Sequence, residues 1–123
     1  MHEYAIADFG RRMGLPHFAL APNGCAALAI EDFGRLELLL HERDGEQELL
    51  LSLIKPVPAY DADIARRVLA ACRYDKGHQL PLHGGVYAGN AVFATRLPQR
   101  ELTAAHLERA VLFLETVQQQ CEV

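Results

Sequence analysis

The residues able to do chemistry are few and widely spaced in this chain. The segment His83-Gly84-Gly85 has the pattern of an oxyanion loop, in which backbone N–H groups stabilise a developing negative charge. Such a loop needs a nucleophile, but the single serine, Ser52, lies within LLLSLIK and not on a G-x-S-x-G elbow. We therefore interpret the glycines as a permitted bend in a sheet, and a small hydrolase using His83 and a thiol remains only a remote alternative.

Thiol and metal chemistry find equally little support. The three cysteines, Cys25, Cys72 and Cys121, include no CxxC pair, and their odd number argues against a disulfide framework and a zinc site. The six histidines form no HxH or HxxxH pair. Cys72 falls late in a predicted helix and Cys25 in a predicted strand, so both are interpreted as small buried hydrophobes. We expect no metal, no cofactor and no enzymatic activity.

The composition predicts a single globular domain. The 123 residues are 50% hydrophobic and 23% charged, which is typical of a folded chain and not of a disordered one. The net charge of −4 argues against nucleic-acid binding, which needs a clustered basic surface. The N-terminus lacks the order of a signal peptide, and no apolar run approaches the roughly 20 residues that cross a bilayer. We expect a cytoplasmic protein without membrane insertion.

The first half of the chain predicts a short helix followed by a meander. Residues 3–13 carry one apolar face and end at Gly14. Two short strands are expected about Asn23-Gly24, and strands over 35–43 and 47–55 are joined by the hairpin signal Asp44-Gly45. Three apolar side chains then fall on the strand face that should meet solvent, and these are Leu39, Leu50 and Ile54.

The second half predicts a central helix over 61–74, with Asp61 as a capping residue, then strands at 86–87 and 91–96. A last helix follows Thr103, its expected N-cap, with Leu102 and Leu107 spaced for a hydrophobic staple. The order is α-β-β-β-α-β-β-α. The predicted class is α+β, with a twisted antiparallel sheet flanked by helices.

The central helix leaves one choice open. Its apolar and small residues span roughly 160° of arc, which exceeds the minimal core-facing stripe. Either the stripe is buried within one chain, or it meets a second copy of the helix. The residues of the stripe are Ile64, Ala65, Val68, Leu69, Ala71 and Cys72.

Five segments in this order resemble the class I type III secretion chaperones, the Tir-chaperone or CesT-like family. The first helix closes with Phe9 to Pro16, and the hairpin from Asn23 to Asp32 places a glycine before a strand that ends at an acidic turn. Val68 to Ala71 is similar to the family's central helix, and Gly84 to Gly89 to its Gly-Gly-x-x-x-Gly segment. Arg96 to Leu102 and the last helix resemble its closing segment.

This resemblance implies a homodimer formed through the central helix and a neighbouring later strand. The candidate interface residues are Ile64, Val68, Leu69, Ala71, Cys72, Val86, Tyr87, Val92 and Phe93. It also implies that the N-terminal segment of a secreted effector wraps around the dimer and stays soluble and export-competent until hand-over to the secretion ATPase. The candidate effector-binding residues are Phe9, Met13, Leu15, Phe18, Leu20, Leu39, Leu50 and Ile54. A regulatory adaptor of the same fold, sequestering a secretion regulator, is the alternative.

Overall fold

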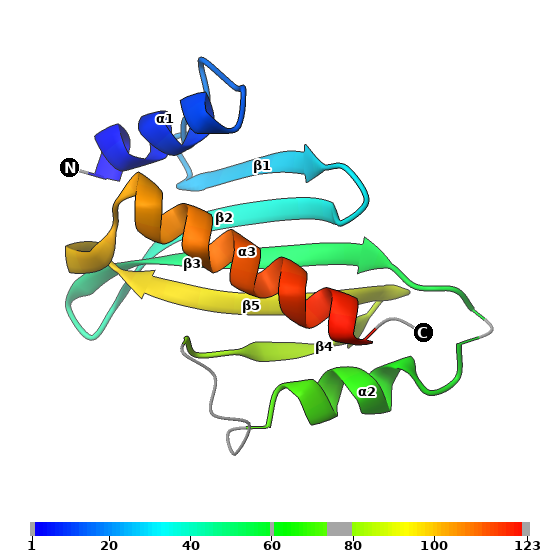
Figure 1. The fold of residues 1–123 in the computed structure, drawn as a ribbon. Coiled ribbons are helices and arrows are strands. Elements are labelled where there is room, and N and C mark those ends of the chain that lie inside the picture. The colour runs from blue at the N-terminus through cyan, green and yellow to red at the C-terminus, as the bar shows by residue number, and fades with distance from the viewer. Residues whose placement is uncertain (1, 60, 74–79, 122–123) are drawn as a thin grey trace.

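The computed structural model describes residues 2–59, 61–73 and 80–121. The elements follow the predicted order of helices and strands (Figure 1). They are α1 (His2–Arg12), β1 (Cys25–Ile30), β2 (Gly34–Arg43), β3 (Glu46–Pro56), α2 (Ile64–Ala71), β4 (His83–Tyr87), β5 (Asn90–Pro98), the short 3₁₀ helix η2 (Gln99–Glu101) and α3 (Ala104–Cys121).

The five strands form one antiparallel sheet in the order β1-β2-β3-β5-β4. The predicted Asp44-Gly45 turn is confirmed: both residues have positive φ, 53° and 83°, as a two-residue hairpin requires. Ala88 and Gly89 form a similar turn between β4 and β5, with φ of 51° and 79°. β5 lies beside β3, so the chain crosses over through α2 before the sheet is completed.

The helices gather on one face of the sheet (Figure 1). α3 crosses β3 and β5, α1 packs beside α3, and α2 lies at the β4 edge. Successive side chains along each strand alternate between the two faces of the sheet, so one side of each central strand is buried beneath the helices. The side chains of this core include Leu36, Leu38, Leu49, Leu51, Leu53, Phe93, Leu97, Leu107 and Leu114. The opposite sheet face is covered by no helix of the described residues.

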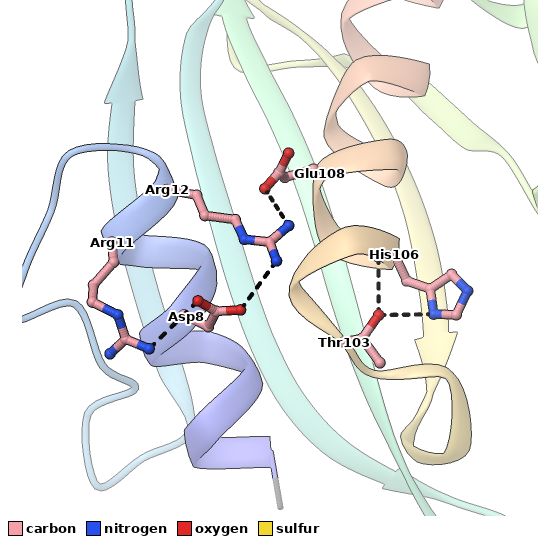
Figure 2. A network of polar contacts seen from close by, with 6 residues as sticks. All are labelled: Asp8, Arg11, Arg12, Thr103, His106 and Glu108. Atoms are coloured by element: carbon pink, nitrogen blue, oxygen red, sulfur yellow. Dashed lines mark hydrogen bonds and ion pairs between the residues drawn. The ribbon is translucent and has the colours of Figure 1, made fainter.

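Two sets of contacts lie at the N-terminal end of α3. The backbone N–H of His106 donates to the Thr103 hydroxyl oxygen at 3.1 Å, which confirms Thr103 as the N-cap (Figure 2). Near the same end Arg12 of α1 lies between two carboxylates, with Nη1 3.0 Å from Glu108 Oε1 and Nη2 3.4 Å from Asp8 Oδ2 (Figure 2). These ion pairs are exposed, so they orient the two helices more than they stabilise them.

Only the second of the two strands predicted for the first hairpin forms, so the prediction of the first strand is wrong. Residues 16–22 form turns and irregular backbone, and only Cys25–Ile30 is a strand. The turn at Asn23-Gly24 does form, because Gly24 has a positive φ of 84° and its N–H donates to the Ala21 carbonyl. Pro16 and Pro22 supply no backbone donor, so this segment is poorly suited to a strand ladder.

The central helix is shorter than predicted, and its start differs. α2 begins at Ile64 and ends at Ala71, and part of the expected helix, from residue 74 on, lies outside the described residues. Asp63 occupies the N-cap position without a side-chain hydrogen bond, so the prediction that Asp61 caps the helix is wrong. The Asp61 carboxylate instead forms an ion pair with Arg67.

The glycine pair at 84–85 also differs from the expectation of a bend. Both glycines lie inside β4, paired with Phe93 and Val92. A Cβ on Gly84 would lie 2.8 Å from the Cys72 sulfur and 2.9 Å from the Val92 oxygen. The glycine is therefore required because α2 approaches the strand closely, and the chain turns later, at Ala88-Gly89.

Candidate interaction surfaces

The uncovered face of the sheet carries the first candidate surface. Leu39 pairs with Leu50 across β2 and β3, and Ile54 pairs with Val92 across β3 and β5. Leu39 is 37% exposed, and the other three are half-buried. A hollow of about 430 Å³ lies beside Leu39 and Leu50 and is also lined by small side chains, including Ala27. This face offers apolar surface without a helix to cover it.

The second candidate surface follows α1. Met13 and Leu15 are each 37% exposed. Phe18 folds back onto the helix, where its ring lies edge-on to Phe9 with 6.3 Å between centroids. A Cβ at Gly10 would lie 2.4 Å from the Cβ of Phe18, so the glycine inside the helix permits this return. Phe9 is fully buried and Leu20 half-buried, so Met13 and Leu15 are the exposed members of the residues predicted for this surface.

The third candidate surface is the outer side of α2. Ile64 and Val68 are buried in the core of the same chain, and Ala71 and Cys72 are half-buried against it. Leu69 is 59% exposed on the other side of the helix, next to the exposed Ala65 along the helical wheel. The stripe of small and apolar residues is thus divided between the core and the surface.

The β4 edge extends this third surface. Tyr87 is 63% exposed, Val86 and Val92 are half-buried, and Phe93 is fully buried beneath the helices. A hollow of about 430 Å³ at this edge is lined by Cys72, Tyr87 and Val92 among others. The sequence grouped these residues with the central helix as candidate dimer contacts, and the structure divides them between the core, where Phe93 lies, and the surface, where Tyr87 lies.

Two exposed apolar side chains were missed in the sequence. Tyr4 of α1 is 72% exposed and Leu112 of α3 is 62% exposed. Leu112 lines a hollow of about 480 Å³ between the two helices, together with Met13. In the sequence Leu112 sits inside the apolar run AVLFL, but it falls outside the helical register of the buried Leu107, Val111 and Leu114, and this periodicity is the signal that could have identified it as exposed.

A charged cluster borders the uncovered face. Glu48 lies 3.1 Å from His41 Nε2, without the alignment of a hydrogen bond, and 3.5 Å from Arg96 Nε. The Nη1 of Arg96 lies 2.9 Å from His83 Nε2, where the neutral ring accepts the hydrogen bond. These contacts run across four strands of the sheet, and they occupy the Nε2 atom of His83.

The geometry gives a hydrolytic site no support. Ser52 and His83 lie in one cross-strand row but two strands apart, with Ala94 between them, which corresponds to about 10 Å. Burial, and to a smaller degree the nearby Cys121, raises the pKa of the Cys72 thiol, which disfavours the nucleophilic thiolate. Within residues 2–59, 61–73 and 80–121, no three histidine, cysteine or acidic side chains are grouped to hold a metal ion. No helix in these ranges is long and apolar enough to cross a membrane.

The family follows from a match over nearly the whole chain. The model of the Tir chaperone protein (CesT) family matches residues 4–121. The chain therefore belongs to this family of chaperones, which confirms the resemblance found in the sequence. No curated protein matches the sequence.

Several solved structures have a fold similar to that of this chain. A chain of the HopA1–SchA chaperone–effector complex has a TM-score of 0.70 at 19% identity, with 97% of this chain and 91% of that chain covered. A chain of the ExsC–ExsE complex has a TM-score of 0.72 at 23% identity, with 96% and 86% covered. The Yersinia pestis type III secretion chaperone SycH with a fragment of YscM2 gives 0.64 at 12% identity, with 98% and 97% covered. At these identities the likeness establishes the shared fold.

Proposed function

We propose that this protein is a cytoplasmic type III secretion chaperone that binds the N-terminal segment of a secreted effector as a homodimer. Membership of the CesT family over residues 4–121 is the observation that carries the proposal. The binding is stoichiometric and involves no catalysis. An effector segment that cannot bury its own apolar groups stays soluble on the chaperone until it is handed to the secretion ATPase.

The exposed apolar surfaces supply the contacts in this proposal. Leu39 and Leu50 form one patch on the uncovered sheet face, and Met13 and Leu15 form another beside α1. β1 lies at the sheet edge, where an extended segment can add as a further strand. The buried Phe9 supports the second patch by holding Phe18 in place. Leu20 and Ile54, both half-buried, extend the two patches at their margins.

The dimer in this proposal uses the other end of the molecule. Leu69 presents apolar surface on α2, and Tyr87 and Val92 continue it at the β4 edge. In this proposal the buried Ile64 and Val68 hold α2 in position against the core of the same protomer. Packed near the same interface are Ala71, Cys72, Val86 and Phe93. Two protomers joined there leave the Leu39–Leu50 patch of each sheet available to one extended client.

The test identifies the client and then maps the bound segment. The tagged chain captures its client from the cells that produce it, and the N-terminal segment of that protein is then expressed alone. We expect the segment to be insoluble or degraded alone and to form a soluble complex with two copies of the chaperone. A client held through a folded domain would overturn the proposal. A client that is a secretion regulator and is not exported would support the adaptor alternative.

Matched variants locate the contact. Leu39→Asp places a charge on the uncovered face, and we expect it to weaken client binding at least tenfold, because a desolvated unpaired charge costs several kcal/mol. Thr116→Asp is the control, since Thr116 is exposed on α3 and lies in neither proposed client-binding patch. Equal losses from both substitutions would exclude the uncovered face as the specific binding surface.

A further inference from the structure

The outer side of α3 carries a cation and a carboxylate on either side of an exposed leucine. Leu112 is 62% exposed, Arg109 is exposed and Glu115 is half-buried. Neither Arg109 nor Glu115 has an ion-pair or hydrogen-bond partner among the residues that the structure describes. They differ in this from the nearby Arg12 and Glu108, which pair with each other across α1 and α3 (Figure 2).

Glu115 gains most from a cation supplied by a partner. Burial raises the pKa of its carboxyl, so its own chain removes water from the carboxylate without providing a compensating charge. Glu115 also lines the hollow of about 480 Å³ between α1 and α3, where Met13 and Leu112 provide apolar wall. A long basic side chain entering this hollow would lay its stem on the apolar wall and place its charge at Glu115.

The spacing of these side chains makes the surface complementary to itself. Arg109, Leu112 and Glu115 are three residues apart, so they form one i±3 row with the charges about 4.5 Å along the axis on either side of Leu112. A two-fold axis through the centre of the row and perpendicular to it exchanges the two ends of the row. Each Arg109 then meets the Glu115 of the other copy, and the two Leu112 side chains meet at the centre. Because an i±3 row is inclined about 45° to the helix axis, two α3 helices paired in this way cross at roughly 90°.

We propose that the outer side of α3 is a self-association surface, at which a second copy of this chain docks with its Arg109 on Glu115 and its Leu112 on Leu112. This surface is separate from the α2 and β4 surface proposed for the dimer, and its three residues belong to neither proposed client-binding patch. One crossing of two helices buries less than the roughly 1,200 Å² of a stable interface, so the association is weak and depends on protein concentration. It also weakens as salt rises, because both ion pairs lie near the surface.

The experiment measures self-association of the full-length chain without a client, so its outcome does not depend on client binding. Every sample carries Leu69→Asp, which removes the contact proposed for α2. We expect sedimentation velocity to show a monomer at low micromolar concentration and a growing dimer fraction towards millimolar concentration, reduced by salt. Arg109→Glu and Glu115→Lys should each weaken this dimer about tenfold, because each turns two attractive contacts into two repulsive ones. Arg100→Glu is the control and should change it less than about twofold, since Arg100 is exposed but lies on η2.

A mixture of the two variants gives the sharpest comparison. Arg109→Glu makes both charges of the row acidic and Glu115→Lys makes both basic, so each variant repels itself and attracts the other. Equal amounts should therefore form a heterodimer at least as stable as the parent dimer, whereas a structural effect on α3 would not be reversed by mixing. A chain that stays monomeric to millimolar concentration, a mixture without recovery, or an equal loss from Arg100→Glu would overturn the proposal. If Glu115→Lys does not fold, the comparison of Arg109→Glu with Arg100→Glu decides it.

Discussion

Arg67 of α2 donates from Nε to the backbone oxygen of Cys121, at the last residue of α3, with a distance of 2.8 Å. The same guanidinium is ion-paired with Asp61, just before α2. One side chain thus joins the start of α2, its middle and the end of α3. Because α2 is only eight residues long, its position depends on such tertiary contacts more than on intrinsic helix stability.

We therefore expect Arg67→Met to reduce the free energy of unfolding by about 1–3 kcal/mol, since the Asp61 carboxylate and the Cys121 carbonyl lose a charged donor. Urea denaturation measures the loss, and hydrogen exchange should show faster opening over 64–71. Arg66→Met is the control. Arg66 pairs with Asp63 at the surface, and its replacement should change stability by less than about 0.5 kcal/mol.

Substitutions at Leu69 and Val68 should distinguish a loss of dimerisation from a loss of protomer stability. Leu69 is 59% exposed, so Leu69→Asp should leave the protomer folded and convert the proposed dimer to a monomer by light scattering. Val68 is fully buried, so Val68→Asp should destabilise the protomer itself by more than about 3 kcal/mol. A dimer that survives Leu69→Asp unchanged would show that α2 is not the interface.

Thr95 offers a stabilising substitution. Its side chain is fully buried in β5, and its hydroxyl has no hydrogen-bond partner among the described residues. Thr95→Val keeps the shape and removes the unsatisfied polar atom, so we expect a gain of about 1 kcal/mol in the free energy of unfolding. Thr103→Val should give the opposite sign, with a loss of about 1 kcal/mol, because Thr103 caps α3. A loss from Thr95→Val would reveal a hydrogen bond that the hydroxyl makes in solution.

The partly buried Glu115 should make the free energy of unfolding depend on pH. Burial raises the pKa of its carboxyl above the ordinary value of 4.5, so the folded state holds this proton more tightly than the unfolded state. The contribution of Glu115 to stability therefore falls as the pH rises from about 4.5 through the folded-state pKa, and the full cost remains above that window. Glu115→Gln should be more stable than the parent at neutral pH, by less than about 1 kcal/mol because the side chain is partly exposed. Urea titrations should show the difference closing below about pH 4.5.

Much of the architecture could be predicted from local signals. Asp44-Gly45 fixes a hairpin because both positions need positive φ, and Thr103 fixes a helix start because its hydroxyl accepts from the first turn. These signals depend on neighbours in sequence, and the structure confirms them. The α-β-β-β-α-β-β-α order is confirmed for the same reason.

The differences arise where a tertiary contact decides the outcome. Gly84 is required by the approach of Cys72 from α2, and Gly10 by the return of Phe18, and neither contact is visible in the local pattern. The apolar stripe of α2 predicted a helix face, but only packing determines that Val68 enters the core and Leu69 does not. Gln118 lies in the polar run QQQ, which gives no sign that the first glutamine is buried.

The crossover between β3 and β5 has a consequence for the order of folding. The β1-β2-β3 meander joins neighbours in sequence, whereas β5 pairs Pro56 with Asn90 and Glu48 with Pro98, across a long intervening chain. Closing that loop costs chain entropy before its contacts form, so the meander should assemble early and β5 should dock late. Substitutions in the meander, such as Leu38→Ala, should then slow folding, while Leu97→Ala in β5 should chiefly accelerate unfolding. Stopped-flow kinetics distinguish the two, and a reversed pattern would place the nucleus across β3 and β5.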